Sequence, residues 1–232
     1  MVLRRQLLNH KMKFRQRYNI NAMADNYLEK RYEEFFGNAK KTHKSSVSLD
    51  TLLEKNRSVR GYNKDVVVSE EVLRRIVGVN TKVASAKNQQ VLRFRLVTRE
   101  SGADLVLPNI KMGGALPELH LPFEGTEPEA FIVVCSNIEP NSWVYTDLGI
   151  SLQSMLLKAV EIGLNGLIIF AFNEKVITEK LNLPYRPLAL LAIGKSAEKF
   201  KLVRISPNDS HKYYRDGGVH YVPKIGVDDL II

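Results

Sequence analysis

The stretch Asp147-Leu-Gly-Ile-Ser-Leu-Gln-Ser-Met-Leu-Leu-Lys-Ala-Val-Glu-Ile162 carries the most informative helical pattern of the chain. Apolar residues recur in it at the three- and four-residue spacing of one helix face, and Gly163 follows as a natural stop. The small residues Gly149, Ser151 and Ser154 would let another backbone approach the helix closely. The sequence therefore predicts a helix over 147–162 that is tightly packed on one side.

Apolar runs on both sides of this segment predict strands. Residues 131–135, 167–172 and 187–193 are entirely apolar, and residues 92–97 alternate as Leu-Arg-Phe-Arg-Leu-Val, which predicts a strand with one wetter face. Strands separated by helices indicate a layered sheet that is covered on both faces. The lone cysteine, Cys135, lies in the first of these runs, so we expect a buried thiol and no internal disulfide.

Two shorter helices are expected before the first strand. Residues 48–56 form one, and Ser69 can cap another that runs to Val77. Glu70 and Glu71 suit the first turn of the second helix, and Val72, Ile76 and Val77 share one face.

The positive charge is concentrated at the N-terminus. The 232 residues carry a net charge of +9, of which residues 1–44 supply +7 with 11 basic and 4 acidic side chains. The rest of the chain is nearly neutral, so we do not expect a nucleic-acid partner, although a basic arm over residues 1–44 is a minor alternative.

The chain divides into three parts. Residues 1–22 hold no acidic residue and no clear apolar period, whereas Met23 opens a pattern typical of a helix. We expect 1–22 to be a basic extension that does not belong to the natural protein, with a basic targeting arm as the alternative. Residues 23–47 would form a helix and a connector, and 48–232 the main domain. No secretory signal or membrane span is evident, and together with the single cysteine this favours a cytoplasmic setting.

Several common kinds of active site are not supported. The chain has no phosphate loop of the Walker type, no Gly-x-Gly-x-x-Gly after a strand and no Gly-x-Ser-x-Gly. Its five histidines are scattered, and none pairs with another at metal-ligand spacing. These observations favour a bound organic cofactor that brings its own chemistry, with no metal ion.

Five segments in order resemble the nitroreductase family, in the short form common in anaerobic bacteria. They are Asn56-Arg-Ser-Val-Arg-Gly-Tyr62, Ala84-Ser-Ala-Lys-Asn-Gln-Gln90, the helix from Asp147, Gly163-Leu-Asn-Gly166 with its strand, and Pro187-Leu-Ala-Leu-Leu-Ala-Ile-Gly194 with the tail Tyr213–Lys224. The resemblance covers about residues 48–232. It implies an α+β, three-layer α/β/α nitroreductase-like fold, with a central mixed sheet, helices on both faces, and an intertwined homodimer with the flavin at its interface.

The resemblance also implies which residues bind FMN. Arg57, Ser58 and Arg60 cluster three donors within four residues, which suits a phosphate, because guanidinium groups bind its oxygens in pairs. Taken alone, the same triplet could equally be a solvated turn. The other positions implied are Asn88 and Gln90 for the pyrimidine edge of the flavin, Ile168, Ile169 and Phe170 for its central ring, and Lys224 for the phosphate.

The activity implied is transfer of electrons from NADH or NADPH through FMN to a small acceptor such as a nitroaromatic, a quinone or another flavin, with no obligate acid–base side chain. The loop from Asn109 to Glu127 would form part of the substrate mouth. Some positions depart from the family pattern: Asn56 replaces an arginine, Ile225 a basic residue, Val91-Leu92 a Pro-Trp pair, and Phe170 a frequent glycine. These departures motivate the alternative of a non-catalytic or specialised flavin-binding protein.

Overall fold

The computed structural model describes residues 47–114 and 116–232. The predictions for the extension 1–22, for the helix after Met23 and for most of the connector lie outside the described residues. Among the described residues, no helix is long and apolar enough to cross a membrane.

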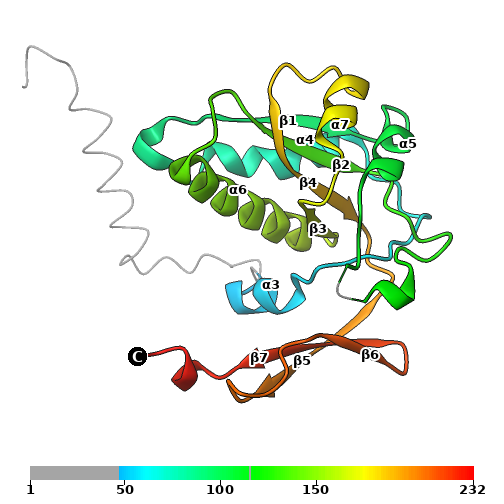
Figure 1. The fold of residues 1–232 in the computed structure, drawn as a ribbon, viewed down its shortest axis with the longest axis vertical. Coiled ribbons are helices and arrows are strands. Elements are labelled where there is room, and N and C mark those ends of the chain that lie inside the picture. Colours follow the sequence, from blue (N-terminus) through cyan, green and yellow to red (C-terminus); the bar gives the residue numbers. More distant parts are fainter. Residues whose placement is uncertain (1–46, 115) are drawn as a thin grey trace, which may run out of the picture. The chain divides into compact units, whose positions relative to one another are not determined.

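A four-stranded sheet forms the centre of the fold (Figure 1). Its order is β1 (Leu92–Val97), β2 (Phe131–Ser136), β4 (Arg186–Gly194) and β3 (Asn165–Ile169). All three pairings are antiparallel, so the expectation of a mixed central sheet is wrong. Strands β2 and β4 are buried along almost their whole length, as in a parallel sheet, because helices cover both faces.

The helices begin at polar caps. Helix α3 (Leu49–Lys55) starts after Ser48 and α4 (Glu70–Val77) after Ser69, and each serine side chain accepts a backbone N–H. Helix α6 (Ser142–Glu161) begins five residues before the predicted start, because the Asn141 side chain caps it by accepting N–H bonds from two residues. The remaining helical segments are α5 (Ala103–Val106), α7 (Glu174–Lys180) and the 3-10 turns Gly78–Thr81, Ala86–Asn88, Leu107–Asn109, Pro117–Leu119 and Val227–Asp229.

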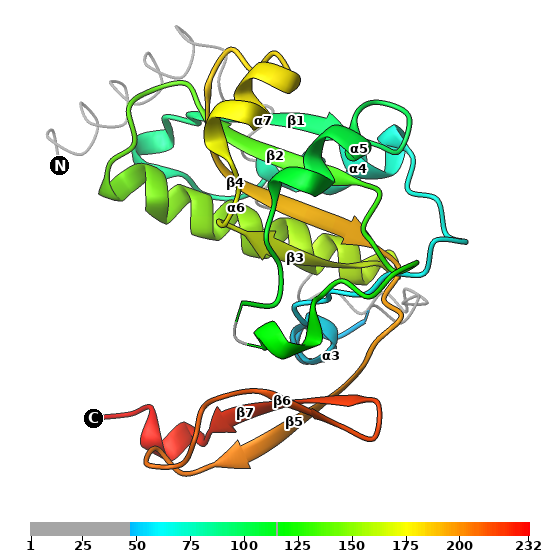
Figure 2. The ribbon, with the colours of Figure 1, turned by 45° about the vertical axis from the view of Figure 1, so that its right-hand side comes forward.

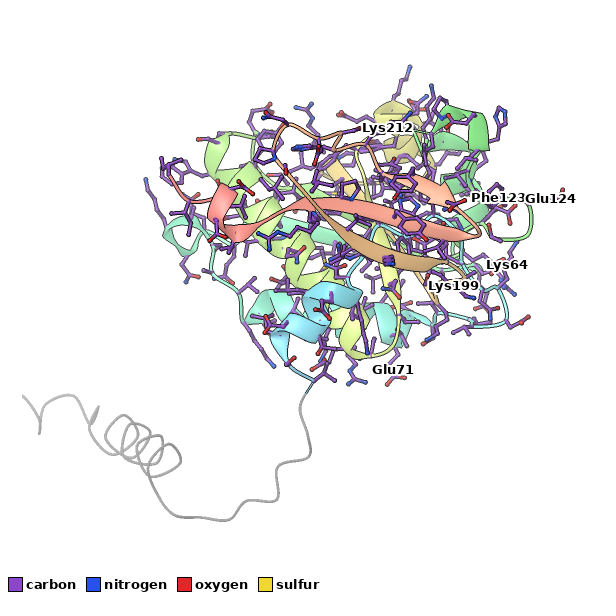
Figure 3. All side chains as sticks on the ribbon, turned by 90° about the horizontal axis from the view of Figure 1, so that it is seen from below. Lys64, Glu71, Phe123, Glu124, Lys199 and Lys212 are labelled. Atoms are coloured by element: carbon purple, nitrogen blue, oxygen red, sulfur yellow. The ribbon has the colours of Figure 1, made fainter. Side chains whose placement is uncertain are left out.

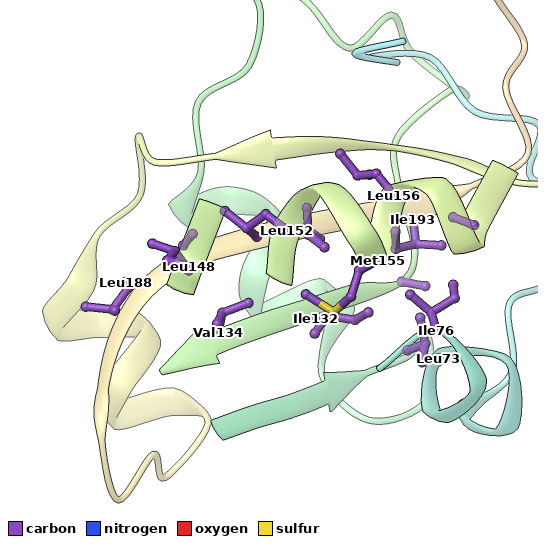
Figure 4. Packing of buried hydrophobic residues seen from close by; sticks show 14 of the residues in the cluster. Leu73, Ile76, Ile132, Val134, Leu148, Leu152, Met155, Leu156, Leu188 and Ile193 are labelled. Atoms are coloured by element: carbon purple, nitrogen blue, oxygen red, sulfur yellow. The ribbon is translucent and has the colours of Figure 1, made fainter. Parts of the chain in front are cut away.

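One face of the sheet packs against α4 and α6 (Figure 4). Leu152 and Met155 of α6 meet Ile132 of β2 in this cluster. Helix α4 contributes Leu73 and Ile76, both fully buried. The buried face of α4 is therefore rotated relative to the predicted one. Leu73 and Ile76 are buried, while Val72 and Val77 are only partly buried.

The opposite face packs against α5 and α7 (Figure 2). Val106 and Ile177 contact the sheet here, together with Cys135 of β2. Burial raises the pKa of the Cys135 thiol to about 11, so the thiol is protonated at neutral pH. The predicted role of Cys135 as a buried core thiol is confirmed.

A second, three-stranded sheet follows β4 and was not expected. Its order is β5 (Lys199–Ile205), β7 (Val219–Ile225) and β6 (Tyr214–Asp216), with β5 and β7 parallel. Gly217 and Gly218 join β6 to β7 with φ of 53° and 75°, the left-handed conformations that tight hairpins need. Figure 3, in which Lys199 is labelled, looks onto this sheet.

Gly166 joins the start of the domain to the central sheet. The Val59 N–H donates to the Gly166 carbonyl at 3.1 Å, and Ser58 forms a parallel bridge with Gly166. A Cβ atom at residue 166 would lie 2.6 Å from the Ala192 carbonyl oxygen and 2.7 Å from Leu156 Cδ2. Only glycine fits between the strand and helix α6 at this position.

We therefore expect Gly166→Ala to lower the free energy of unfolding by about 3 kcal/mol, the upper end of the usual cost of overpacking, because a backbone carbonyl cannot move aside. Urea unfolding followed by circular dichroism measures this change. Gly114→Ala is the matched control: its added Cβ meets nothing within 4 Å, so we expect a change within about 0.5 kcal/mol. Equal stability of the two variants would contradict the steric argument.

Candidate functional site

A cavity of about 340 Å³ lies between the start of the domain, α6, β3 and the second sheet. This volume is within the range of roughly 300–1,000 Å³ that is typical of small-molecule sites. It brings together four of the predicted phosphate and flavin positions, Arg57, Ser58, Arg60 and Lys224, with Ile168. The other lining residues are Leu53, Asn56, Gln153, Leu156, Phe200, Tyr213, His220 and Val222.

Hydrogen bonds from side chains to backbone carbonyls hold the Arg57–Arg60 segment in place. Asn165 Nδ2 donates to the Lys55 carbonyl at 2.9 Å, just before the pairing with Gly166. The Tyr62 hydroxyl donates to the Val59 carbonyl at 2.9 Å, in a fully buried position. Because Val59 points into the core, its neighbours Ser58 and Arg60 are directed to the cavity side.

The guanidinium groups are only partly satisfied by the protein. Arg57 donates an Nη2 bond to the Leu53 carbonyl, and Arg60 donates to the Ser58 carbonyl at 3.1 Å and to the Tyr213 hydroxyl at 3.3 Å. The Nε atoms of Arg57 and Arg60 are buried and have no hydrogen-bond partner among the described residues. Burial also lowers the pKa of Arg57. A bound anion would satisfy these donors and offset the cost of burying their charge.

One carboxylate, that of Glu198, supports the cluster from outside the cavity. It accepts the Arg60 N–H at 2.8 Å and forms an ion pair with Arg215. Its side chain is 8% exposed and that of Arg215 is 20% exposed. Arg215 also lies 5.6 Å from the ring of Phe123, a residue of the expected substrate-mouth loop that is labelled in Figure 3. None of the cavity-lining residues is acidic, so the described part of the site is positively charged.

Asn88 and Gln90 lie elsewhere in the chain's own fold. They belong to the turn around Ala86–Asn88, which is fixed by a 2.8 Å bond from the Ala86 N–H to Asp147 Oδ1, near the start of α6. Gln90 borders a separate cavity of about 560 Å³ between α4, β1 and α6. A single chain therefore does not bring Asn88 and Gln90 to the arginine cluster.

The three β3 positions also separate. Ile168 lines the cavity, whereas the Ile169 side chain is buried in the core on the other face, as strand alternation requires. Phe170 follows the end of β3 and is 63% exposed. The strand predicted over 167–172 is thus displaced toward 165–169, which leaves the Phe170 ring outside the sheet.

Sequence reasoning missed four side chains at or beside the cavity: Tyr213, His220, Glu198 and Arg215. All belong to the second sheet or lead into it. The alternation Lys-Phe-Lys-Leu-Val-Arg-Ile over 199–205 and the Gly-Gly pair at 217–218 were signals that could have placed them. No cluster of metal-ligating side chains occurs among residues 47–114 and 116–232.

Comparison with protein-family models gives a match over residues 53–195 to the model described as the nitroreductase family. The chain belongs to the nitroreductase family. The match ends at the last residues of the central fold, so the second sheet, with His220 and Lys224, lies beyond it. A comparison with curated proteins gives no significant match.

Solved structures of nitroreductase family proteins share the fold. An FMN-dependent nitroreductase from Clostridium difficile R20291 is 28% identical, with 64% of this chain and 87% of that chain covered and a TM-score of 0.51. A nitroreductase family protein from Clostridium novyi NT is 21% identical over 65% and 87% of the two chains, with a TM-score of 0.54. A protein from Exiguobacterium sibiricum 255-15, solved in complex with FMN, is 20% identical over 70% and 95%, with a TM-score of 0.56.

The Glu198 pair gives a prediction about stability. Glu198→Gln removes the charge that faces Arg215 and leaves a mostly buried guanidinium unpaired, so we expect a loss of about 3 kcal/mol in the free energy of unfolding. Chemical denaturation at pH 7 measures the loss. The control is Glu139→Gln, whose partner Arg186 is well exposed, with an expected effect within about 0.5 kcal/mol. A loss no larger than that of the control would show that Glu198 does not support the cluster.

Proposed function

We propose that this protein is an FMN-dependent oxidoreductase that passes electrons from NADH or NADPH to a small acceptor such as a nitroaromatic, a quinone or another flavin. The observation that carries the proposal is the cavity bordered by Arg57, Ser58, Arg60 and Lys224 in a chain of the nitroreductase family, with no carboxylate among the described residues that line it. Two of the similar structures are named for FMN, and a third, from sphigopyxis sp. strain HMH, is named as FMN- and NADPH-dependent.

The residues present fit the phosphate of FMN. Unpartnered, buried Nε atoms on Arg57 and Arg60 provide donors that only a further acceptor can satisfy. The Ser58 hydroxyl and the Lys224 ammonium would complete the contacts to the phosphate. Asn56, which stands where relatives carry arginine, donates to Gln153 Oε1 at 3.3 Å and so attaches the segment to α6. The clamp thus has one charge fewer than the family pattern.

When bound, FMN supplies the redox chemistry by accepting a hydride equivalent and passing electrons on. The chain's own residues would bind and orient it and limit water access. Ile168 would border the ring system, and the exposed Phe170 would shape the opening toward the acceptor. We assign no acid–base step to any side chain.

We propose that the working unit is a homodimer with the three-layer fold, in which both chains line each site. Asn88 and Gln90 do not share a cavity with Arg57, so a complete site would need these two parts from different chains. Helix α6 exposes apolar side chains that a second copy would cover: Trp143 is 61% and Tyr145 54% exposed, and Ile150 follows on the same helix. Residues 48–232 would form this FMN-binding domain, acting in the cytoplasm.

Purified protein is expected to be yellow and to release about one FMN per chain on denaturation. Absorbance spectra and chromatography of the released chromophore measure this. With NADH or NADPH and menadione or nitrofurazone, turnover should greatly exceed that of free FMN. Bound flavin without turnover would instead support the alternative of a non-catalytic or specialised flavin-binding protein. Colourless protein that does not bind added FMN would contradict both the oxidoreductase and the flavin-binding protein.

Mixed dimers test whether the site needs two chains. Arg57→Ala should weaken FMN binding roughly tenfold to a hundredfold, from the loss of a charged hydrogen bond. Asn88→Gly removes the amide while keeping the positive φ of 54° at this residue. A dimer of one variant chain of each kind retains one complete site. Random mixing makes about half of the dimers mixed, so about a quarter of the flavin binding should be restored.

Flavin fluorescence of refolded mixtures, compared with each variant refolded alone, measures this recovery. Arg186→Ala is the control, because Arg186 pairs with Glu139 and Glu174 outside the cavity and should not change FMN affinity. If the mixture binds no more FMN than the average of the two variants, the site lies within one chain.

A further inference from the structure

His220 on β7 is the least exposed of the polar residues that line the arginine cavity. It is 3% exposed, and its Nδ1 atom is buried without a hydrogen-bond partner in the part of the chain that the structure describes. Its ring lies between Tyr213 and Phe200, with centroid distances of 4.9 and 5.3 Å. A buried nitrogen that makes no bond within the protein is rare, because the desolvation cost is not offset. This atom is therefore a candidate ligand-binding group.

Positively charged groups lie near His220 on the segment before α4, on β6 and on its own strand β7, whereas β5 contributes the ring of Phe200. Arg60 lies on the segment before α4, with its guanidinium carbon 5.0 Å from the Tyr213 ring centre, and Arg215 lies directly opposite His220 in the β6–β7 register. Lys224 lies on the same strand, four residues further along. The Glu198 carboxylate beside this cluster is already engaged by Arg215 and by the Arg60 N–H, and the charge of Glu54 acts on Arg57.

These surroundings keep the imidazole neutral while the cavity holds no anion. Burial, followed by the charges of Arg215 and Arg60, lowers the pKa of His220 to about 4. An anion on the same arginines would change the sign of the local field and offer an acceptor for an N–H of the imidazole. With an anion bound, the electrostatic surroundings that lower the pKa of His220 would raise it instead, so the imidazole would bind a proton.

We propose that His220 is an additional ligand of the phosphate-type anion in this cavity, and that it takes up one proton from solvent when the anion binds. The inference rests on the proposed function for FMN, but the chemistry needs only a phosphate group on the Arg57–Arg60 cluster. The proton goes from water or buffer to the imidazole, and the resulting cation bonds to a phosphate oxygen. No covalent bond to the ligand forms or breaks.

Isothermal titration calorimetry of the full chain at pH 6.5, in two buffers of different ionisation enthalpy, counts the protons taken up. The probes are FMN and inorganic pyrophosphate, with riboflavin as the ligand that lacks phosphate. His220→Asn keeps a polar group near Nδ1 that cannot titrate, and His220→Phe keeps the ring between Tyr213 and Phe200. His211→Gln is the matched control, because His211 is exposed in the segment before β6 and bonds only to the Pro207 carbonyl.

We expect wild type and His211→Gln to take up about half to one proton more per bound FMN than either His220 variant. Wild-type affinity for FMN should also rise, relative to that of His220→Asn, by about fivefold as the pH falls from 8 to 6, because a group protonated mainly in the complex strengthens binding below its bound-state pKa. The ionisation of the ligand phosphate is common to both proteins and cancels in this ratio. Riboflavin should show no difference.

Equal proton uptake in wild type and in both His220 variants would overturn the inference while leaving FMN binding intact. If pyrophosphate binds with His220-dependent uptake and FMN does not bind, the inference holds and the proposed function fails. If neither probe binds wild type, both fail. Should His220→Asn not fold, His220→Phe alone decides, since its packing is conserved and its nitrogens are absent.

Discussion

The contact on which the site depends is the backbone pairing between Gly166 and the segment Ser58–Val59. It attaches the start of the domain to the outer side of β3, and it requires a residue without a side chain, because helix α6 and β4 leave no space for one. Once this pairing forms, Val59 enters the core and Arg60 is directed to the cavity. The steric constraint at Gly166 thus places the arginine segment, and the bond from the Arg60 N–H to the Glu198 carboxylate supports it.

The electrostatic organisation follows from that placement. Three guanidinium groups gather at one end of the domain. The Nε atoms of Arg57, Arg60 and Arg215 have no hydrogen-bond partner within residues 47–114 and 116–232. The Glu198 carboxylate compensates part of the charge from behind, the charge of Glu54 acts on Arg57, and His220 stays neutral beside them. Under the proposed function, a negative group in the cavity would offset the free energy needed to gather these like charges.

Much of the central fold could be predicted from the sequence, because strong local signals determine it. Ser48 and Ser69 cap their helices as expected, and the strands at 92–97, 131–136 and 186–194 follow their apolar patterns. Pairing direction was not predictable, since a strand buried on both faces reads alike in parallel and antiparallel sheets. The start of α6 was misplaced because the predicted helix was begun at Asp147, although Val144 lies four residues before Leu148 on the buried face and Asn141 caps the helix. The predicted positions at Arg57, Ser58, Arg60, Ile168 and Lys224 came together, but His220 and Glu198 depend on a segment beyond residues 53–195, which the family model matches.

The cavity is built from residues near both ends of the described chain, with Arg57 and Arg60 early and His220 and Lys224 late. The central sheet, by contrast, is complete at Gly194. During synthesis the core can therefore assemble while the second sheet is still inside the ribosome. Until the second sheet emerges, Arg57 and Arg60 remain without Glu198, His220 and Lys224. A chain cut short after the central sheet would lack Tyr213, His220 and Lys224, which line the cavity of the proposed anion site. Under the proposed function, such a chain would have the central sheet without a complete anion site.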